Sequence, residues 1–427
     1  MKLIEETKIG NYSKSVFDNG LRVISEFVPE VKSFALGFYF NVGSRDDKIS
    51  GTAHYLEHIL FKNTKKRDKK QIADTFDLLG AFYNAETEKE NTHFYVRCIS
   101  SRFEEIFELF SDITLNTIFV DDELEKEKLV VLEELKFCDD ETEEYIVDLY
   151  DKVLYGNNAM ARPIGGTLNS VSKIYKDDLI EFYNNFYGYD NLIVCVAGDV
   201  SHNKILELVD KYFDDKRELK KNSIFSSRQV PSIKQISINE NIKFHRELKQ
   251  SYLMLGKITP GFYDNEKYAR NVINIIFGDG ASSRLSQNLR EKHGLAYTVY
   301  SGLTNYSDCG SLYISAIVDN KNYNRAIDLI YEEILNLKNN IPNKVEILKA
   351  KEQLKTDFIL SLEDMNSRIQ TLYNDEIIFN RKVSIKEFFK LIDNISLDDL
   401  MFVIDKYFNI DNWIQVALLA TQKKNKK

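Results

Sequence analysis

Two periods of hydrophobic and polar positions alternate along the first half of the chain. Residues 21–26 and 33–42 alternate or run apolar, and residues 91–99 alternate again, which is typical of β-strands. Helical spacing of apolar residues recurs in four further segments: 51–61, 68–79, 103–116 and 123–137. Strands mixed with paired helices predict an α+β fold, with a mostly antiparallel sheet and helices packed on one face.

The second half of the chain repeats part of the first. Residues 177–193 read DDLIEFYNNFYGYDNLI, and residues 398–414, which begin 221 positions later, read DDLMFVIDKYFNIDNWI. In both segments an amphipathic helix runs into an apolar strand. A weaker match relates residues 79–83 to residues 293–297. These repeats predict two duplicated domains with the same fold.

The chain length agrees with this division. Single hydrophobic cores stop growing near roughly 250–300 residues, so 427 residues predict more than one domain. We expect an N-terminal domain at 1–215 and a C-terminal domain at 223–427, joined by the Lys- and Asp-rich segment Asp214–Asn222. The net charge of −9 argues against nucleic acid as a partner, because nucleic-acid binding needs a basic surface.

The compartment is predicted from the N-terminus and the cysteines. The first residues, MKLIEETK, lack the apolar core of a secretory signal and the Arg-rich character of a transit peptide. No apolar stretch is long enough to span a membrane. The cysteines are far apart and match no metal-binding or redox spacing: Cys98, Cys138, Cys195 and Cys309. These features predict a cytoplasmic protein with reduced cysteines and no membrane partner.

A candidate metal site lies in the first predicted helix pair, in the run HYLEH. His54 and His58 are four residues apart, so both imidazoles lie on one face of a helix and can bind one ion. Glu57 shares that face and can act on a water molecule as a general base. The pattern HxxEH is the zinc-binding HExxH motif in reverse order, the inverzincin motif. Two solvated histidines at this spacing also occur by chance, but the corresponding segment of the second half, NVINIIF, keeps this face apolar.

A catalytic zinc with an open position needs a third protein ligand. In the helix at 123–137, Glu127 and Glu134 lie close to the apolar stripe that faces inward, whereas Glu133 and Glu125 point elsewhere. The inward stripe consists of Leu124, Val131 and Leu135. An inward carboxylate is costly unless it is paired or binds a metal. Glu134 is therefore the candidate ligand and Glu127 the candidate orienting residue. The alternative is an ordinary charged helix.

These residues resemble the pitrilysin/insulinase family of zinc metallopeptidases. VGSRDD…GTAHYLEHILFKNT (42–64) looks like the active-site signature of that family, and EKEKLVVLEEL (125–135) looks like its third-ligand helix. Further matching segments are NAETEKENTHFY (84–95), RPIGGT (162–167), VAGD (196–199) and GASSRLSQNLREKHGLAYTVYS (280–301). The resemblance covers nearly the whole chain. The chain length suits the family's half-length subunits, which include the mitochondrial processing peptidase and its bacterial relatives.

The resemblance implies a set of roles. His54, His58 and Glu134 would bind one zinc ion, Glu57 would be the general base, and Glu127 would orient a ligating histidine without binding the zinc itself. Arg290 and Tyr297 would belong to the catalytic machinery as well, with Arg290 holding the substrate and Tyr297 stabilising the oxyanion. Asn84 and Ala85 would pair with an extended peptide substrate at a sheet edge.

The resemblance also implies an assembly. Family members enclose peptides between two half-shells of two domains each, and one chain of this length supplies one half-shell. A homodimer that cleaves unfolded oligopeptides is therefore expected, with Arg290 and Tyr297 acting on the zinc of the partner subunit. The alternatives are a processing peptidase for one substrate and an inactive structural subunit. One departure from the family is His293, where Arg is common. The FGDGASS segment (277–283) is short, so the long glycine-rich loop of the mitochondrial non-catalytic subunit is absent, which weakens an assignment to presequence processing.

Overall fold

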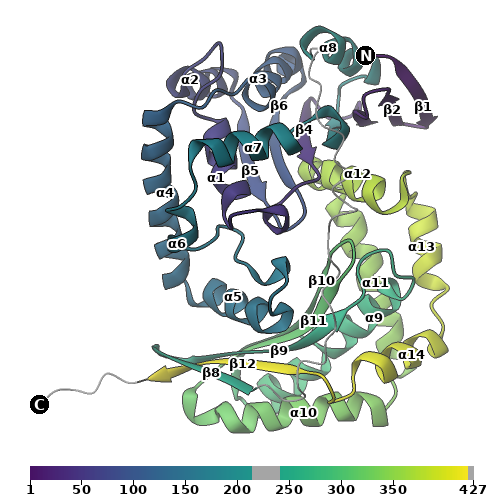
Figure 1. Ribbon diagram of the computed structural model, residues 1–427. Helices are drawn as coiled ribbons and strands as arrows, with labels where there is room; N and C mark the ends of the chain where they lie inside the picture. Colours follow the sequence, from purple (N-terminus) through teal and green to yellow (C-terminus); the bar gives the residue numbers. More distant parts are fainter. Residues whose placement is uncertain (214–240, 422–427) are drawn as a thin grey trace, which may run out of the picture. The chain divides into compact units, whose positions relative to one another are not determined.

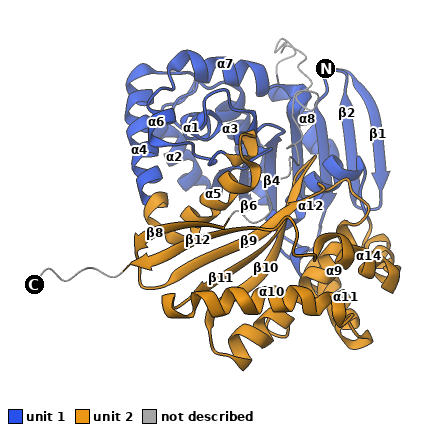
Figure 2. Cartoon of the chain, turned by 60° about the horizontal axis from the view of Figure 1, so that its bottom comes forward, with its two compact units in different colours: residues 1–137, 162–228, 360–383 blue, residues 138–161, 229–359, 384–427 orange. Residues whose placement is uncertain are grey.

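A computed structural model describes residues 1–213 and 241–421 and divides them into two compact units (Figure 2). Of the described residues, unit 1 comprises 1–137, 162–213 and 360–383, and unit 2 comprises 138–161, 241–359 and 384–421. The predicted linker at 214–222 lies outside the described residues. Mixed helices and two sheets confirm the predicted α+β class.

Unit 1 is built on a seven-stranded sheet with the order β1-β2-β3-β7-β4-β6-β5, of which β1, β2, β4, β5 and β6 are labelled in Figure 1. Its strands are β1 (Leu3–Ile9), β2 (Tyr12–Phe17), β3 (Arg22–Phe27), β4 (Ser33–Phe40), β5 (Phe82–Thr87), β6 (Thr92–Ile99) and β7 (Leu192–Gly198). All neighbouring strands are antiparallel except β3 and β7, which are parallel. This sheet is mostly antiparallel, as predicted, and β5 forms one of its edges.

Most helices of unit 1 cover one face of this sheet. They are α1 (Thr52–Leu60), α2 (Lys69–Leu79), α3 (Phe103–Leu115), α4 (Asp121–Asp140, which ends in unit 2), α6 (Leu168–Val171), α7 (Lys176–Phe186) and α8 (His202–Tyr212). Alternate residues of β4, among them Phe34, Leu36 and Phe38, are fully buried in the core beneath these helices. The helix and strand segments predicted in the first half of the chain are confirmed, and their ends shift by at most three residues.

The other face of the unit 1 sheet is also covered, and this corrects the expectation of helices on one face only. Helix α12 (Met365–Phe379) packs Ile369, Leu372 and Tyr373 against the remaining side chains of the central strands. Tyr373 stacks on Tyr39 of β4 with ring centroids 4.4 Å apart. The physical reason is visible in β7, whose residues are all buried, because a strand that is buried on both faces needs an apolar layer on each side.

Unit 2 contains a five-stranded sheet with the order β10-β11-β9-β12-β8. Its strands are β8 (Asn241–Glu247), β9 (Ser251–Thr259), β10 (Ala296–Asn305), β11 (Gly310–Val318) and β12 (Ile414–Thr421). Strands β12 and β8 are parallel, and the other pairs are antiparallel. The order repeats the core of unit 1, with β8, β12, β9, β11 and β10 in the places of β3, β7, β4, β6 and β5. This correspondence supports the predicted duplication.

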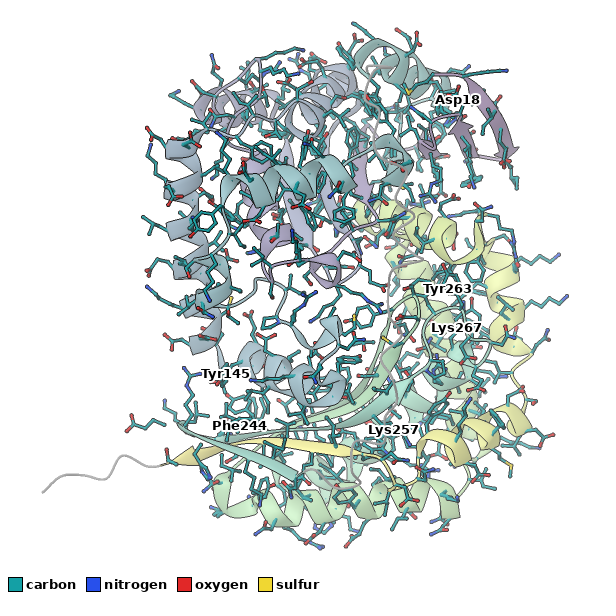
Figure 3. All side chains as sticks on the ribbon, in the orientation of Figure 1. Asp18, Tyr145, Phe244, Lys257, Tyr263 and Lys267 are labelled. Atoms are coloured by element: carbon teal, nitrogen blue, oxygen red, sulfur yellow. The ribbon has the colours of Figure 1, made fainter. Side chains whose placement is uncertain are left out.

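Helices cover both faces of the unit 2 sheet as well. They are α5 (Thr142–Tyr155), α9 (Lys267–Phe277), the π-helix Ser286–Lys292, α10 (Tyr323–Asn339), α11 (Lys344–Ser361), α13 (Ile385–Asp393) and α14 (Leu397–Tyr407). Helices α9, α10 and α14 share the main core of the unit. Helix α5 packs on the opposite face, where its Tyr145 lies beside the same apolar cluster as Phe244 of β8 (Figure 3).

The compact units exchange two segments relative to the boundary that the sequence predicts. Residues 138–161, which carry α5, join unit 2, and residues 360–383, which carry α12, join unit 1. Each exchanged helix supplies the apolar layer on the second face of a sheet. Hydrophobic periodicity predicts that such a helix exists, but it does not predict the sheet against which the helix packs.

Other expectations concern membranes and cysteines. None of the helices in residues 1–213 and 241–421 combines the length and apolarity that crossing a membrane requires. The four cysteines form no disulfide with one another. Cys98, Cys195 and Cys309 are buried and Cys138 is half-buried, so three of the four lie in a core as predicted.

Candidate metal centre

Helix α1 carries the HYLEH run, and the loop before it holds its N-terminus. The helix follows Gly51, whose φ of 97° favours glycine. The buried carboxylate of Asp47 accepts hydrogen bonds from the backbone amides of Gly51 (2.7 Å), Thr52 (3.1 Å) and Ala53 (2.9 Å). Burial raises the pKa of Asp47 to about 7, although the amides of Ala53 and Gly51 favour the charged form. Asp47 therefore satisfies the free amides at the start of α1.

The segment RPIGGT closes over the same end of α1. A Cβ atom at Gly166 would lie 2.5 Å from the carbonyl oxygen of Ser50, and a Cβ at Gly51 would lie 2.6 Å from the carbonyl oxygen of Gly165. The Arg162 guanidinium donates hydrogen bonds to the carbonyl oxygens of Asp47 (2.9 Å) and Arg45 (2.8 Å). Backbone approaches this close require glycine, and they fix the position of α1 in unit 1.

The ligand candidates meet where α1 faces α4. The Tyr55 hydroxyl donates to the carbonyl oxygen of Leu124 at 2.5 Å and links the two helices. Glu134 Oε1 lies 3.6 Å from Nε2 of His54, and Glu134 Oε2 lies 3.3 Å from Nε2 of His58. Among residues 1–213 and 241–421, these residues form the one group of three or more His, Cys, Asp and Glu side chains whose ligand atoms lie within 4.8 Å of one another.

This geometry fits a tetrahedral zinc ion. Bonds of about 2.0–2.2 Å from a tetrahedral zinc to nitrogen and oxygen place neighbouring ligand atoms roughly 3.4 Å apart. Both His–Glu distances are close to that value. Two imidazole nitrogens and one carboxylate oxygen are donors that zinc prefers, and three protein ligands leave a fourth position open. The residues present therefore fit the ion that the sequence predicts.

Glu127 lies behind His58, as the helix-face argument predicts. Its Oε1 is 2.9 Å from Nδ1 of His58, and its Oε2 is 2.8 Å from Nζ of Lys62. A proton on Nδ1, donated to Glu127, leaves Nε2 of His58 free to bind a metal. On the exposed side of α4, Glu125 and Glu133 point to solvent, which also agrees with the prediction.

The two histidines differ in the pKa of their imidazoles. Burial, together with the nearby His58, lowers the pKa of His54 to about 4, although Glu134 opposes this shift. Burial would also lower the pKa of His58, but hydrogen bonds to Glu127 and Glu134 outweigh it and raise this pKa to about 9. The hydrogen bond to His58 lowers the pKa of Glu134. The carboxylates therefore concentrate negative charge where a cation would bind.

Glu57 lies on α1 between the two candidate ligands, and its side chain is fixed by a strand. The Thr87 hydroxyl, at the end of β5, donates a hydrogen bond of 2.5 Å to Glu57 Oε2. Burial raises the pKa of Glu57, and the hydrogen bond from Thr87 partly opposes this effect. A carboxylate with a raised pKa can both accept and return a proton near neutral pH.

The remaining candidates lie on strands and helices outside this cluster. Asn84 and Ala85 are on the edge strand β5, as predicted, and Asn84 Nδ2 lies 3.3 Å from the Tyr95 hydroxyl of β6. Arg290 and Tyr297 belong to unit 2, on the π-helix and on β10. The Arg290 side chain is 58% exposed and Tyr297 is 77% exposed, so both are accessible to a partner or substrate. The roles of these four residues stay predictions.

Four residues that support this site were not identified as such from the sequence. Asp47 caps α1 from five positions before its first residue, whereas sequence rules search for a cap at the position of Gly51. Thr87 lies two residues after Ala85, so the period of a strand could have placed it on the same side of β5. Lys62 and Arg162 act through Glu127 and through backbone carbonyls, and no local pattern identifies such contacts.

Comparison with known proteins gives the same family as the motifs. Residues 22–168 match the family model described as "Insulinase (Peptidase family M16)", and residues 173–354 match the model described as "Peptidase M16 inactive domain". An uncharacterized zinc protease from Mycobacterium leprae is 32% identical over 93% of this chain and 89% of its own. An uncharacterized zinc protease from Bacillus subtilis, YmxG, is 30% identical over 92% of this chain and 95% of its own.

Solved structures agree at the level of the fold. A protease from Helicobacter pylori superposes with a TM-score of 0.86 at 23% identity, over 95% of this chain and 99% of that one. All three candidate ligands lie within the segment that matches the insulinase model. Together, the full-length relatives at 30% identity or more show that this chain belongs to the insulinase family of peptidases, family M16.

Proposed function

We propose that this protein is a zinc-dependent endopeptidase that cleaves unfolded oligopeptides. The observation that carries the proposal is the convergence of His54, His58 and Glu134, with Glu57 on the same helix as the two histidines. The full-length relatives, which are named zinc proteases, support both the metal and the class of reaction. We propose one zinc ion per chain, which the single group of three ligand candidates among the described residues supports.

The residues around the cluster divide the chemistry between them. A zinc ion held by His54, His58 and Glu134 supplies a Lewis acid that activates water and polarises the scissile carbonyl. Glu57 accepts the proton of the attacking water and returns it to the leaving amine nitrogen. Burial raises the pKa of Glu57, which suits a group that takes up a proton and then gives it back.

The edge strand β5 supplies a binding surface for the peptide main chain. A substrate in extended conformation pairs with β5 as an added strand, beside Asn84 and Ala85. Thr87 of the same strand contacts Glu57, so the paired peptide runs past the base. Main-chain pairing depends little on side chains, and this favours a peptidase of broad specificity over a processing enzyme for one substrate.

We further propose that the active enzyme is a homodimer. Arg290 and Tyr297 are exposed on unit 2, and they would hold the substrate and stabilise the oxyanion at the zinc of the partner subunit. One chain carries both halves of such a site, so a second kind of subunit is not required. A cytoplasmic location remains part of the proposal.

A second candidate function is an inactive partner subunit, which the match of residues 173–354 to an inactive-domain model makes worth testing. The Glu57→Gln variant separates the two. If the protein is a peptidase, this variant retains zinc and loses cleavage of an unfolded peptide, with a fall of roughly 10²–10⁴-fold, as expected when general acid–base catalysis is lost. Equal cleavage by the variant and the wild type would refute the assignment of Glu57.

A further inference from the structure

We propose that Thr87 is a positioning residue that holds the Glu57 carboxylate in its reactive orientation. The inference rests on the proposed function and deepens it, because it names what keeps the base in place. The observation is the hydrogen bond of 2.5 Å from Thr87 Oγ1 to Glu57 Oε2. Thr87 does not reach the substrate or the metal in this account, and it acts through Glu57 alone.

The contact selects one of the two carboxylate oxygens. Because the Thr87 hydroxyl already takes up one acceptor site of Oε2, we assign to Oε1 the role of accepting the proton of the attacking water. A glutamate side chain has three rotatable torsions, so a carboxylate without this donor would sample several orientations. The hydrogen bond from Thr87 fixes the position of Glu57 Oε2 and so restricts these orientations, whereas Oε1 stays available for the reaction.

Thr87 is itself held in a rigid part of the sheet. Thr87 is 9% exposed and lies opposite Thr92 in the antiparallel pairing of β5 with β6. A β-branched side chain has restricted χ1 rotation, so the hydroxyl direction follows the backbone of the strand closely. Reactive groups are held best when their supports lie on regular elements rather than on loops.

Both the base and the proposed substrate contact the same strand, β5. Helix α1 lies against β5 (Figure 1), and β5 is the edge at which the peptide is proposed to add. A peptide paired with β5 and a carboxylate bonded to β5 keep their relative position when the strand shifts. A misplacement of about 1 Å at a reacting group can cost about a hundredfold in rate, so this shared reference matters for catalysis.

Three variants test the proposal. Thr87→Val keeps the shape and removes the hydroxyl, whereas Thr87→Ser keeps the hydroxyl and removes the methyl group. Thr75→Val is the matched control, because the Thr75 hydroxyl bonds the carbonyl oxygen of Gln71 on the exposed side of α2. Each purified variant is assayed for zinc content and for kcat and KM on an unfolded peptide, and crystal structures give the Glu57 orientation.

The expected result is a fall in kcat of about tenfold or more in Thr87→Val, with KM and zinc content close to wild type. Thr87→Ser recovers kcat to within about threefold of wild type, and Thr75→Val matches wild type. In the crystal structures Glu57 is displaced in Thr87→Val and in place in Thr87→Ser. This change in the position of Glu57 is seen in the crystal structures and does not depend on any measurement of activity.

Three results would overturn the inference: wild-type kcat in Thr87→Val, equal loss in the valine and serine variants, or loss of zinc from Thr87→Val. The last would make Thr87 a support of the metal site rather than of the base. Failure of the proposed function is distinguishable, because the wild type would then cleave no peptide or Glu57→Gln would cleave as fast as the wild type, while the crystal structures still report the orientation of Glu57. An inactive Glu57→Gln beside a fully active Thr87→Val would reject the role of Thr87 alone.

Discussion

The carboxylate of Glu127 lies between the imidazole of His58 and the ammonium group of Lys62. Its two oxygens are 2.9 Å from His58 Nδ1 and 2.8 Å from Lys62 Nζ. Burial would raise the pKa of Glu127, but the hydrogen bonds from His58 and Lys62 outweigh it and lower this pKa. Glu127 in turn orients the ring of His58 toward Glu134. A chain of polar contacts, here called the relay, joins Lys62, Glu127 and His58 and determines how strongly His58 can bind a metal.

Weakening this relay is expected to lower the affinity for zinc. Glu127→Gln should reduce it about 10–100-fold, the usual cost of losing a group that orients a metal ligand, and Lys62→Met should reduce it less. Zinc competition with a chromogenic chelator measures both values. Lys65→Met, at an exposed neighbouring position, is the control. Unchanged affinity in Glu127→Gln would contradict the relay.

The glycine loop beside α1 gives a second prediction. Gly166 has a φ of 79°, and a Cβ there would lie 2.5 Å from the Ser50 carbonyl oxygen. Gly166→Ala should therefore lower both stability and zinc affinity, because the clash moves the start of α1. Gly80→Ala is the control: its φ of 63° is also left-handed, but a Cβ there meets nothing within 4 Å.

These two variants separate backbone strain from displacement of the helix. Gly80→Ala should cost about 1–2 kcal/mol of stability through its left-handed conformation and leave zinc binding unchanged. Thermal unfolding and zinc titration measure the two effects. Similar zinc affinities for Gly166→Ala and Gly80→Ala would show that the loop does not position the ligands.

The homodimer proposal predicts complementation between defective subunits. Glu57→Gln lacks the base and Tyr297→Phe lacks the oxyanion donor, so each variant alone should be nearly inactive. Mixed under conditions that exchange subunits, they should form one intact site in a heterodimer and recover a substantial fraction of activity. The mass of the complex is measured alongside. Absence of any recovery in a mixture that forms heterodimers would reject a site shared between subunits.

A buried lysine in unit 2 predicts a dependence of stability on pH. Lys257, labelled in Figure 3, is 8% exposed, and its Nζ lies 3.0 Å from Asn409 Oδ1. Burial lowers the pKa of Lys257 from 10.5 to about 8. The unfolded chain then binds more protons than the folded one between these values, so stability should rise as the pH increases from about 8 to 10.5.

Replacing this lysine should remove that rise. Lys257→Met should flatten the pH dependence of the unfolding temperature above pH 8, while Lys344→Met, at an exposed position of α11, should leave it as in the wild type. A steep rise that persists in Lys257→Met would assign the dependence to other groups.

Much of the candidate site could be predicted because its information is local. His54, Glu57 and His58 share one helix, and helical geometry alone places Glu134 rather than Glu133 toward the interior. In the structure Glu134 meets both histidines, and Glu133 is exposed. Glu127 is buried and Glu134 is half-buried. A carboxylate that is withdrawn from solvent is costly unless it is paired or binds a metal, so its position on a helix is informative even in a single sequence.

The contacts that escape prediction join distant segments. Thr87 reaches Glu57 across thirty positions of sequence. Helix α12 covers the sheet of unit 1 although it follows most of unit 2 in the chain. Hydrophobic periodicity identifies an apolar helix face, but the partner of that face is chosen by tertiary packing. The sequence repeat predicts that the two halves share a fold, whereas the order of the strands comes from the structure.

Zinc removal and return is the measurement that tests the central claim most directly. The protein is depleted of metal with a chelator, dialysed, and titrated with zinc while cleavage of an unfolded peptide library is followed. We predict that the depleted protein is inactive and that activity returns in proportion to zinc, reaching its maximum at one ion per chain. Cleavage at the original rate without metal, or a zinc-loaded protein that cleaves no peptide in the library, would contradict the account.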